Sequence, residues 1–348
     1  MVTSAFNPPL VVPSFSSRGF PQDRKNLRKV TRQHFRSFAD SFSSFLVSAF
    51  DLHFGYIRPS DIPKNSVVFV DSGGYESREW EDDSATHLKL LPHVHEKWTQ
   101  ALLARTIRSL PDEPRFVYVN YDLEAGLSAQ VSSATAQLRH LRSAKRSFLL
   151  KEEPVLVKKE RVRGQMVPIV RTLSKLPQVA DSLSKFEIFG ITEKSLGYSY
   201  HDRIANLHLL CCLLKKLNLN LPVHVFGALD PLSVRTYAMA GADIFDGLTW
   251  IRFAYRGNRC VYLSNDILTQ SDLTENFTEG RNAVYARNYV ELLKLEMELK
   301  DYRSTGNPQK LKIDPATKSK VRFAIYQAQH SEAYKKLIGS PSQLSGRP

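Results

Sequence analysis

Three aspartates stand where short apolar runs of this sequence would end as β-strands. Asp71 follows Val67–Val70, Asp122 lies shortly after Phe116–Val119, and Asp246 follows Asp243–Phe245. Paired carboxylates suit glycosyl transfer, because one stabilises or captures an oxocarbenium-like centre while the other, tuned toward protonation, moves a proton. A turn or a helix cap also explains each aspartate taken alone. Both interpretations therefore stay open at the level of single residues.

Residues next to the first aspartate suit a planar ligand. Gly73 and Gly74 let the backbone approach a ligand closely. Tyr75 offers an aromatic face on which a base can stack. His93 and His95 flank one residue, as a metal-binding pair can, but no third ligand is evident nearby and surface histidines are the favoured interpretation. We expect neither a metal ion nor a cofactor.

The elements that position these residues can be read from the alternation of apolar runs with helical patterns. Apolar residues between Ile204 and Leu217 recur at three- and four-residue spacing, which places them on one face of a helix. Asp230 and Pro231 have the types favoured at a helix start, and Gly241 has the type favoured after a helix end. Strands alternating with helices predict a (β/α)8 TIM barrel, with a doubly wound open sheet as the alternative. The eight β-rich runs are Leu10–Val12, Phe45–Val47, Val67–Val70, Phe116–Val119, Val167–Val170, Phe186–Phe189, Val223–Phe226 and Asp243–Phe245.

A barrel would bring the candidate residues together. The carboxyl ends of its strands converge on one mouth, where active sites are built. We therefore expect the three aspartates around a single cavity of purine size. Arg171 would join them from the end of the fifth run, and Gly190 and Gly227 from the ends of the sixth and seventh.

The pattern changes near the C-terminal end of the chain. We predict a barrel domain over residues 1–300, which ends with a helix at Asn282–Leu299, and a helical extension over 301–348. The extension is expected to hold a basic loop at Tyr302–Lys320 and a last helix at Val321–Ile338. The tail from Ser340 is expected to be disordered.

Composition bounds the partners and the compartment. Lys and Arg outnumber Asp and Glu by 48 to 35, and the resulting net charge of +13 favours a polyanionic partner such as nucleic acid. Two basic series, around Arg28 and around Arg142, fit either a phosphate-contacting surface or a solvated face. No membrane span and no signal peptide are expected, and three cysteines offer no disulfide framework. We therefore predict a cytoplasmic protein.

Three stretches, taken together and in order, resemble the guanine transglycosylases. They are VVFVDSGGYES (Val67–Ser77), NYDLE (Asn120–Glu124) and HVFGALDPLSVRTYAMAGADIFDGL (His224–Leu248). This family includes the tRNA enzymes of queuosine and archaeosine synthesis and the DNA 7-deazaguanine transglycosylases. The similarity is spread over most of residues 1–300, and it implies a TIM barrel and a pentosyltransferase activity.

The resemblance implies a role for each matching residue. Asp246 matches the nucleophile that attacks C1′ of the sugar and forms a covalent glycosyl-enzyme, and Asp71 matches the general acid/base. Tyr75 matches the aromatic residue that stacks on the base, and Asp122 matches the carboxylate that reads its N1 and 2-amino edge. The remaining matches are Gly190 and Ile191 on one wall of the base pocket, Phe226 and Gly227 on the opposite wall, and Arg252 and Arg256 near the nucleic-acid backbone.

Departures from the tRNA enzymes favour the DNA-modifying branch. Those enzymes carry a cysteine-rich zinc segment after the nucleophile, whereas Cys260 stands alone here, so the zinc subdomain is expected to be missing. Arg171, at the base, and Glu76 stand where the tRNA enzymes have glutamines, and no C-terminal RNA-binding domain is apparent. We therefore expect replacement of guanine in DNA by a 7-deazaguanine such as 7-cyano-7-deazaguanine (preQ0), with accessory proteins of a DNA-modification system among the partners.

Three alternatives stay open. The first is a tRNA-guanine transglycosylase, in which the nucleic-acid partner is tRNA. The second is a catalytically silent nucleic-acid-binding subunit of the same family, which the presence of both Asp71 and Asp246 disfavours. The third is a barrel glycoside hydrolase, which also uses two carboxylates but has little use for a net charge of +13.

Overall fold

A computed structural model of the chain describes residues 6–20, 26–77, 97–157, 160–270 and 277–339. The predictions for His93, His95 and the tail from Ser340 fall outside these residues. No helix within the described ranges is both long enough and apolar enough to cross a membrane.

Eight strands form a closed parallel barrel in the order β1-β10-β9-β8-β5-β4-β3-β2, as expected for a (β/α)8 fold. Most of these strands are buried along their whole length, because a parallel barrel is covered on both faces. The backbone N–H of Leu10 donates to the carbonyl of Asp243 at 3.0 Å, which links the first strand to the last. The strands are β1 (Leu10–Phe15), β2 (Ser44–Ser48), β3 (Val67–Asp71), β4 (Phe116–Val119), β5 (Lys145–Leu150), β8 (Ile188–Thr192), β9 (Val223–Phe226) and β10 (Ile244–Gly247).

The described chain groups into two compact units. The first, unit 1, holds residues 1–6, 13–122 and 134–147, and so contains β2, β3 and β4. The second, unit 2, holds residues 7–12, 123–133 and 148–348, and so contains β8, β9 and β10. The predicted boundary at residue 300 falls inside one helix of unit 2, and the division at that residue stays a prediction.

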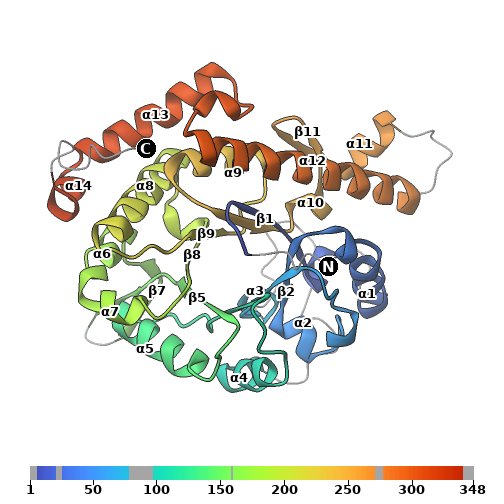
Figure 1. Cartoon of the computed structure of the whole chain (residues 1–348), viewed down its shortest axis with the longest axis horizontal. Helices are drawn as coiled ribbons and strands as arrows, with labels where there is room; N and C mark the ends of the chain where they lie inside the picture. Colours follow the sequence, from blue (N-terminus) through green and yellow to red (C-terminus); the bar gives the residue numbers. More distant parts are fainter. Residues whose placement is uncertain (1–5, 21–25, 78–96, 158–159, 271–276, 340–348) are drawn as a thin grey trace. The chain divides into compact units, whose positions relative to one another are not determined.

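In unit 1, the first helix packs on the strands through one apolar face (Figure 1). Its buried residues recur at helical spacing, and the Phe35 ring meets Phe15 and Phe45 edge to face. The helices of this unit are α1 (Leu27–Phe38), α2 (Ala49–His53), α3 (Gly74–Ser77) and α4 (Gln100–Arg108), with 3₁₀ turns at Ser17–Gly19, Ala39–Ser41 and Pro59–Asp61. Helix α5 (Leu127–Leu138) follows β4.

In unit 2, the helix starts follow from local sequence. Asp230 caps α9 (Pro231–Ala240) by accepting from the N–H groups of Leu232 and Ser233, and Gly241 ends it in the left-handed conformation, both as predicted. The other helices are α6 (Ile169–Leu173), α7 (Ala180–Leu183), α8 (Tyr200–Lys216), α10 (Thr249–Arg252), α11 (Leu263–Gln270), α12 (Phe277–Thr305), α13 (Pro315–His330) and α14 (Glu332–Leu337), with 3₁₀ turns at Leu176–Val179, Lys194–Leu196 and Pro308–Lys310.

Two antiparallel hairpins and the C-terminal helices complete unit 2. The hairpins are β6 (Pro154–Val157) with β7 (Glu160–Met166), and β11 (Phe253–Arg256) with β12 (Arg259–Tyr262). Helix α12 packs against α9, and α13 packs against α8 and α9, so the C-terminal segment belongs to the packed fold (Figure 1).

Two predictions about elements are wrong. The fifth barrel strand is Lys145–Leu150 rather than Val167–Val170, since residues 169–173 form α6 after Pro168. Arg171 is therefore an exposed helix residue and does not follow a barrel strand. The predicted basic loop at Tyr302–Lys320 is also mostly helical, because α12 continues to Thr305 and Asp314 caps α13 from Pro315.

Candidate active site

In unit 1, Asp71 is the last residue of β3. The strand pairs in parallel with β2 and β4, and Asp71 lies opposite Ser48. The four residues before it are buried, whereas Asp71 itself is half-buried. Asp71 therefore stands where the apolar strand ends and the loop that leads to α3 begins.

The loop after Asp71 is tied to Asp122, so unit 1 brings together two of the predicted site segments. The Ser72 hydroxyl donates to Asp122 Oδ1 at 2.6 Å, and the Gly74 N–H donates to the Ser72 hydroxyl at 3.2 Å. A Cβ atom at Gly74 would lie 2.4 Å from Asp122 Oδ2, so only glycine allows the carboxylate to approach so closely. Trp98 completes the support, since its Nε1 donates to the Ser72 carbonyl at 2.8 Å.

Tyr75, the predicted stacking residue, keeps an accessible ring. It is 43% exposed, and the Arg18 guanidinium lies 4.9 Å from the ring centroid in a cation–π arrangement. Arg18 also donates to the carbonyl of Glu76 at 3.2 Å. Arg18 thereby contacts both Tyr75 and the Glu76 backbone of α3, and part of the Tyr75 ring stays exposed.

Two buried acids lie behind this segment. Glu76 accepts from the Ser16 hydroxyl at 2.5 Å, and Asp51 accepts from the backbone N–H and the hydroxyl of Ser17 at 2.7 and 2.6 Å. Burial of Asp51, and secondarily repulsion from Glu76, raise the pKa of Asp51 well above its ordinary value. Through its two bonds to Ser17, Asp51 ties the 3₁₀ turn after β1 to α2.

In unit 2, Asp246 lies within β10 and is held by two donors. Its Oδ1 lies 3.0 Å from His224 Nε2 and accepts from the Gly227 N–H at 3.1 Å. The side chain of His224 is fully buried, and that of Asp246 is 8% exposed. One carboxylate oxygen is therefore fixed in orientation by groups on the neighbouring strand β9 and the residue just after it.

The residues around His224, the partner of Asp246, include an aromatic ring and a glycine. The Phe226 ring stacks on His224 with centroids 3.8 Å apart, and a Cβ atom at Gly190 would lie 2.6 Å from Phe226 Cε2. Phe226 and Gly190 were expected on opposite walls of a base pocket, but the ring lies directly on the glycine. Ile191 is fully buried and lies opposite Val225, so its side chain packs in the core.

The predicted backbone-binding arginines differ in their surroundings. Arg252 is exposed at the end of α10. Arg256, on β11, binds Asp266 through its Nε at 2.6 Å, and Asp266 also binds Arg287. The Arg256 side chain is therefore held in an ion pair.

No group of three potential metal ligands occurs among the residues that the structure describes. Cys260, on β12, instead donates to Asp230 Oδ2 at 2.8 Å, and burial first, then the bond to Asp230, raise the pKa of its thiol. The absence of a metal and of a zinc subdomain stays a prediction.

Sequence reasoning missed three residues of these two arrangements. His224 interrupts the otherwise apolar strand Val223–Phe226, and a polar residue inside a buried strand is a signal that it has a polar partner. Ser72 and Trp98 offered no comparable signal, because nothing in the sequence indicates that Trp98 packs against the loop after β3.

No protein-family model matches the chain. The chain is similar to the tRNA-guanine(15) transglycosylase of Haloarcula marismortui, with 21% identity over 276 residues. The aligned region is 71% of this chain and 52% of that protein, so the chain spans about half the length of its relative. This distant similarity supports a relationship to the guanine transglycosylases.

Proposed function

We propose that the chain is a base-exchange transglycosylase that replaces guanine in DNA with a 7-deazaguanine through a covalent glycosyl-aspartate. The observation that carries the proposal is the Asp246 carboxylate, one oxygen of which is held by His224 and by the Gly227 N–H, while His224 itself stacks on the Phe226 ring. The similarity to a tRNA-guanine(15) transglycosylase supports the same class of reaction.

Asp246 has the surroundings that a nucleophile needs. Two donors on Oδ1 orient the carboxylate, and orientation of a reacting group lowers the barrier by removing the cost of aligning it. In the first step, an Asp246 oxygen forms a bond to C1′ of the nucleotide, and the bond from C1′ to N9 of guanine breaks. In the second step, N9 of the incoming base bonds to C1′ and the bond to Asp246 breaks.

Asp71 and Asp122 take the roles of proton transfer and base recognition. Asp71 gives a proton to the departing guanine and receives one from the incoming base, so that protons balance over the exchange. Asp122, fixed by Ser72 and packed on Gly74, accepts from the N1–H and 2-amino groups of the base. Tyr75 supplies a stacking face for a base that has left its helix.

DNA is the proposed substrate, and tRNA is the second candidate. Cys260 is bonded to Asp230, which fits the proposed loss of the zinc segment of the tRNA enzymes. The similarity to an enzyme named for position 15 of tRNA favours the second candidate. Arg171 is an exposed residue of α6, and the proposal gives it no role in binding the base.

Exchange of radiolabelled guanine tests the proposal. The purified chain is offered duplex DNA and unmodified tRNA in parallel, each with labelled guanine or preQ0, with and without a cell extract that supplies accessory proteins. We expect label to enter DNA, and a protein–DNA adduct to survive denaturing electrophoresis. Asp246→Asn should abolish both, because an amide is a poor nucleophile, while Asp181→Asn, at an exposed helix residue, should retain both.

The outcomes separate the candidates. Label in tRNA alone assigns the chain to the tRNA-directed reaction. Binding of nucleic acid with neither label nor adduct identifies a silent subunit. Undiminished exchange by Asp246→Asn contradicts the mechanism itself.

A further inference from the structure

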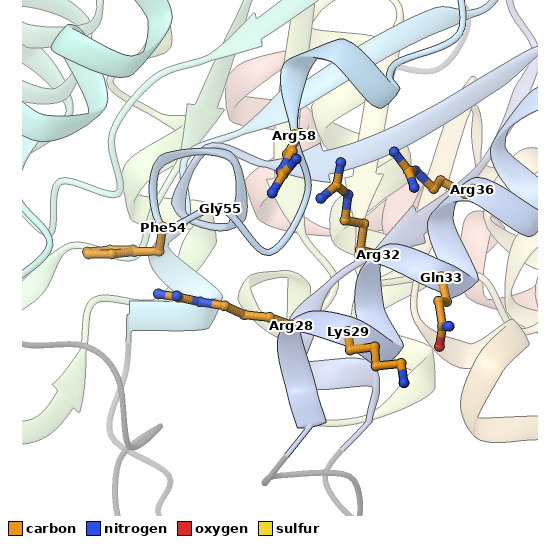
Figure 2. Close-up of a pocket in the computed structure, with 8 residues that line it drawn as sticks. All are labelled: Arg28, Lys29, Arg32, Gln33, Arg36, Phe54, Gly55 and Arg58. Carbon is orange, nitrogen blue, oxygen red and sulfur yellow. The ribbon is translucent and has the colours of Figure 1, made fainter.

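A basic pocket opens on unit 1, apart from the residues assigned to the reaction (Figure 2). Its volume is about 540 Å³, and it is formed by α1 and by the segment that follows α2. The residues that line it are Arg28, Lys29, Arg32, Gln33, Arg36, Phe54, Gly55 and Arg58.

The cations of this pocket form a stripe. Arg28, Arg32 and Arg36 recur every four residues, so they lie along one face of α1 over about 12 Å. Lys29 extends the stripe, and Figure 2 shows Arg58 directed toward the arginines of α1 from the other side of the pocket. Five cations from two segments of the chain thus line the pocket.

Asp61 orients two of the arginines without cancelling the charge. It accepts from Arg32 Nε at 2.7 Å and from an Arg36 terminal nitrogen at 2.7 Å. Burial acts to raise the pKa of Asp61, but the hydrogen bonds from Arg32 and Arg36 outweigh it and hold the pKa below the ordinary value. One carboxylate therefore fixes two guanidinium groups, and the pocket keeps a strong excess of positive charge.

The pocket is joined to the Asp71 loop through packed aromatic residues. The rings of Phe54 and Trp98 lie 6.1 Å apart, and Trp98 donates to the carbonyl of Ser72. Phe50 also packs on Trp98, with centroids 5.6 Å apart. A ligand held in the pocket is thus held at a fixed place relative to Asp71.

We infer that this pocket binds the phosphodiester backbone of the nucleic-acid substrate, outside the nucleotide that reacts. One strand of duplex DNA carries a phosphate about every 3.4 Å of axis, so a stripe of about 12 Å spans roughly three to four phosphates of one backbone, and several of the five cations can contact them together. Planar guanidinium groups bind phosphate oxygens through paired hydrogen bonds. The inference rests on the proposed function, because it assigns the bound backbone to the substrate of that reaction.

The test compares two charge-matched triple variants. The pocket variant is Arg28→Gln, Lys29→Gln and Arg58→Gln, which spares the two arginines bound to Asp61. The control variant is Lys64→Gln, Arg105→Gln and Arg108→Gln, which removes three exposed cations of the same unit that do not line the pocket. Filter binding of a radiolabelled 24-base-pair duplex and of a tRNA transcript is measured at several salt concentrations, with thermal melting as a check on folding.

The pocket variant should bind the preferred nucleic acid about tenfold or more weakly than the control. The slope of log affinity against log salt should fall by between about two and three, because each phosphate contact contributes about 0.9. At saturating nucleic acid, guanine exchange should keep its kcat while KM for nucleic acid rises.

Two results overturn the inference. One is equal affinity and equal salt slope for a folded pocket variant and the control. The other is unaltered nucleic-acid binding with loss of binding to phosphatidylserine vesicles, which identifies a membrane-surface site. Failure of the proposed function is distinguishable, because it abolishes exchange by the unmodified chain while the affinity difference between the two variants persists.

Discussion

At His224, one buried imidazole determines how Asp246 is presented. The bond from Nε2 to Asp246 and the stacking on Phe226 are both made by this ring. His224 is a positioning residue, since it acts on the reaction through the carboxylate. Its removal should therefore lower the rate of the chemical step more than the affinity for nucleic acid.

Replacement of His224 separates these effects. His224→Leu should lower kcat for guanine exchange by about tenfold to a hundredfold, because a misdirected carboxylate attacks poorly. His224→Gln retains an N–H donor and should recover part of the loss, while KM for nucleic acid stays within about twofold in both variants. Single-turnover formation of the covalent adduct measures the step. Equal rates for the unmodified chain and His224→Leu would show that the bond has no role in the reaction.

Asp51 makes stability depend on pH. Since its folded pKa lies above the ordinary value of 3.8, the folded chain binds a proton that the unfolded chain has released. The contribution of Asp51 to the free energy of unfolding is therefore largest at low pH. It declines as pH rises from about 4 through the folded pKa.

Asp51→Asn removes that proton equilibrium. The difference in unfolding free energy between the unmodified chain and Asp51→Asn should shrink as pH rises above the ordinary pKa of 3.8, as measured by urea unfolding. Asp40→Asn, at an exposed acid, corrects for the general loss of one negative charge. A difference that grows with pH contradicts a folded-state pKa of Asp51 above its ordinary value.

At the scale of elements, one buried ion pair joins α9 to the C-terminal helices. Arg235 on α9 makes two parallel bonds to Glu298 on α12, at 2.7 and 2.9 Å. Glu298 also accepts from the Lys312 N–H, in the segment that leads to α13. Removing one partner leaves the other charge buried without a counter-charge, whereas removing both partners does not.

Urea unfolding of single and double variants tests this connection. Glu298→Ala should cost about 3–5 kcal/mol, because Arg235 stays buried without its carboxylate. The double variant Arg235→Met with Glu298→Met should be less destabilised than Glu298→Ala alone. Equal destabilisation of the two would mean that the stranded charge is not the cause.

The fifth strand shows where sequence patterns mislead at this scale. Strand β5 begins with Lys145 and Arg146, which are half-buried and belong to the basic series around Arg142, for which a phosphate-contacting surface or a solvated face was expected. Their long stems can lie along apolar surface while the charges reach water, so they do not prevent a strand. The run at 167–170 is apolar enough for a strand, yet its proline begins a short helix.

At the scale of the whole molecule, the closed barrel could be predicted from the alternation of strands and helices. The alternation remains recognisable even when one strand is assigned to the wrong residues. The position of Asp71 at a strand end was predictable for the same reason. Contacts that depend on packing were not. The bond between His224 and Asp246 requires the parallel pairing of β9 and β10, and the approach of Trp98 to Ser72 crosses 26 residues of sequence.

The structure also shows where some of the positive charge of the molecule is concentrated. A surplus of 48 cations over 35 anions is a property of composition, and it predicts only a polyanionic partner. The pocket beside α1 concentrates five of those cations, of which Arg32 and Arg36 share the Asp61 carboxylate, and Arg256 outside the pocket is held by Asp266. Charge at the sequence level therefore overstates the number of residues available for phosphate.

Trp98 lies between the basic pocket and the loop after Asp71. Its indole touches Phe54 at the rim of the basic pocket and binds the backbone beside Asp71, whereas Trp250 is buried near Tyr285 in unit 2. Indole emission responds to the polarity and quenching groups around the ring. The sequence holds three tryptophans, so replacing Trp80 and Trp250 by phenylalanine would leave Trp98 as the emitting indole, and its emission would then report on occupancy at either side without any attached dye.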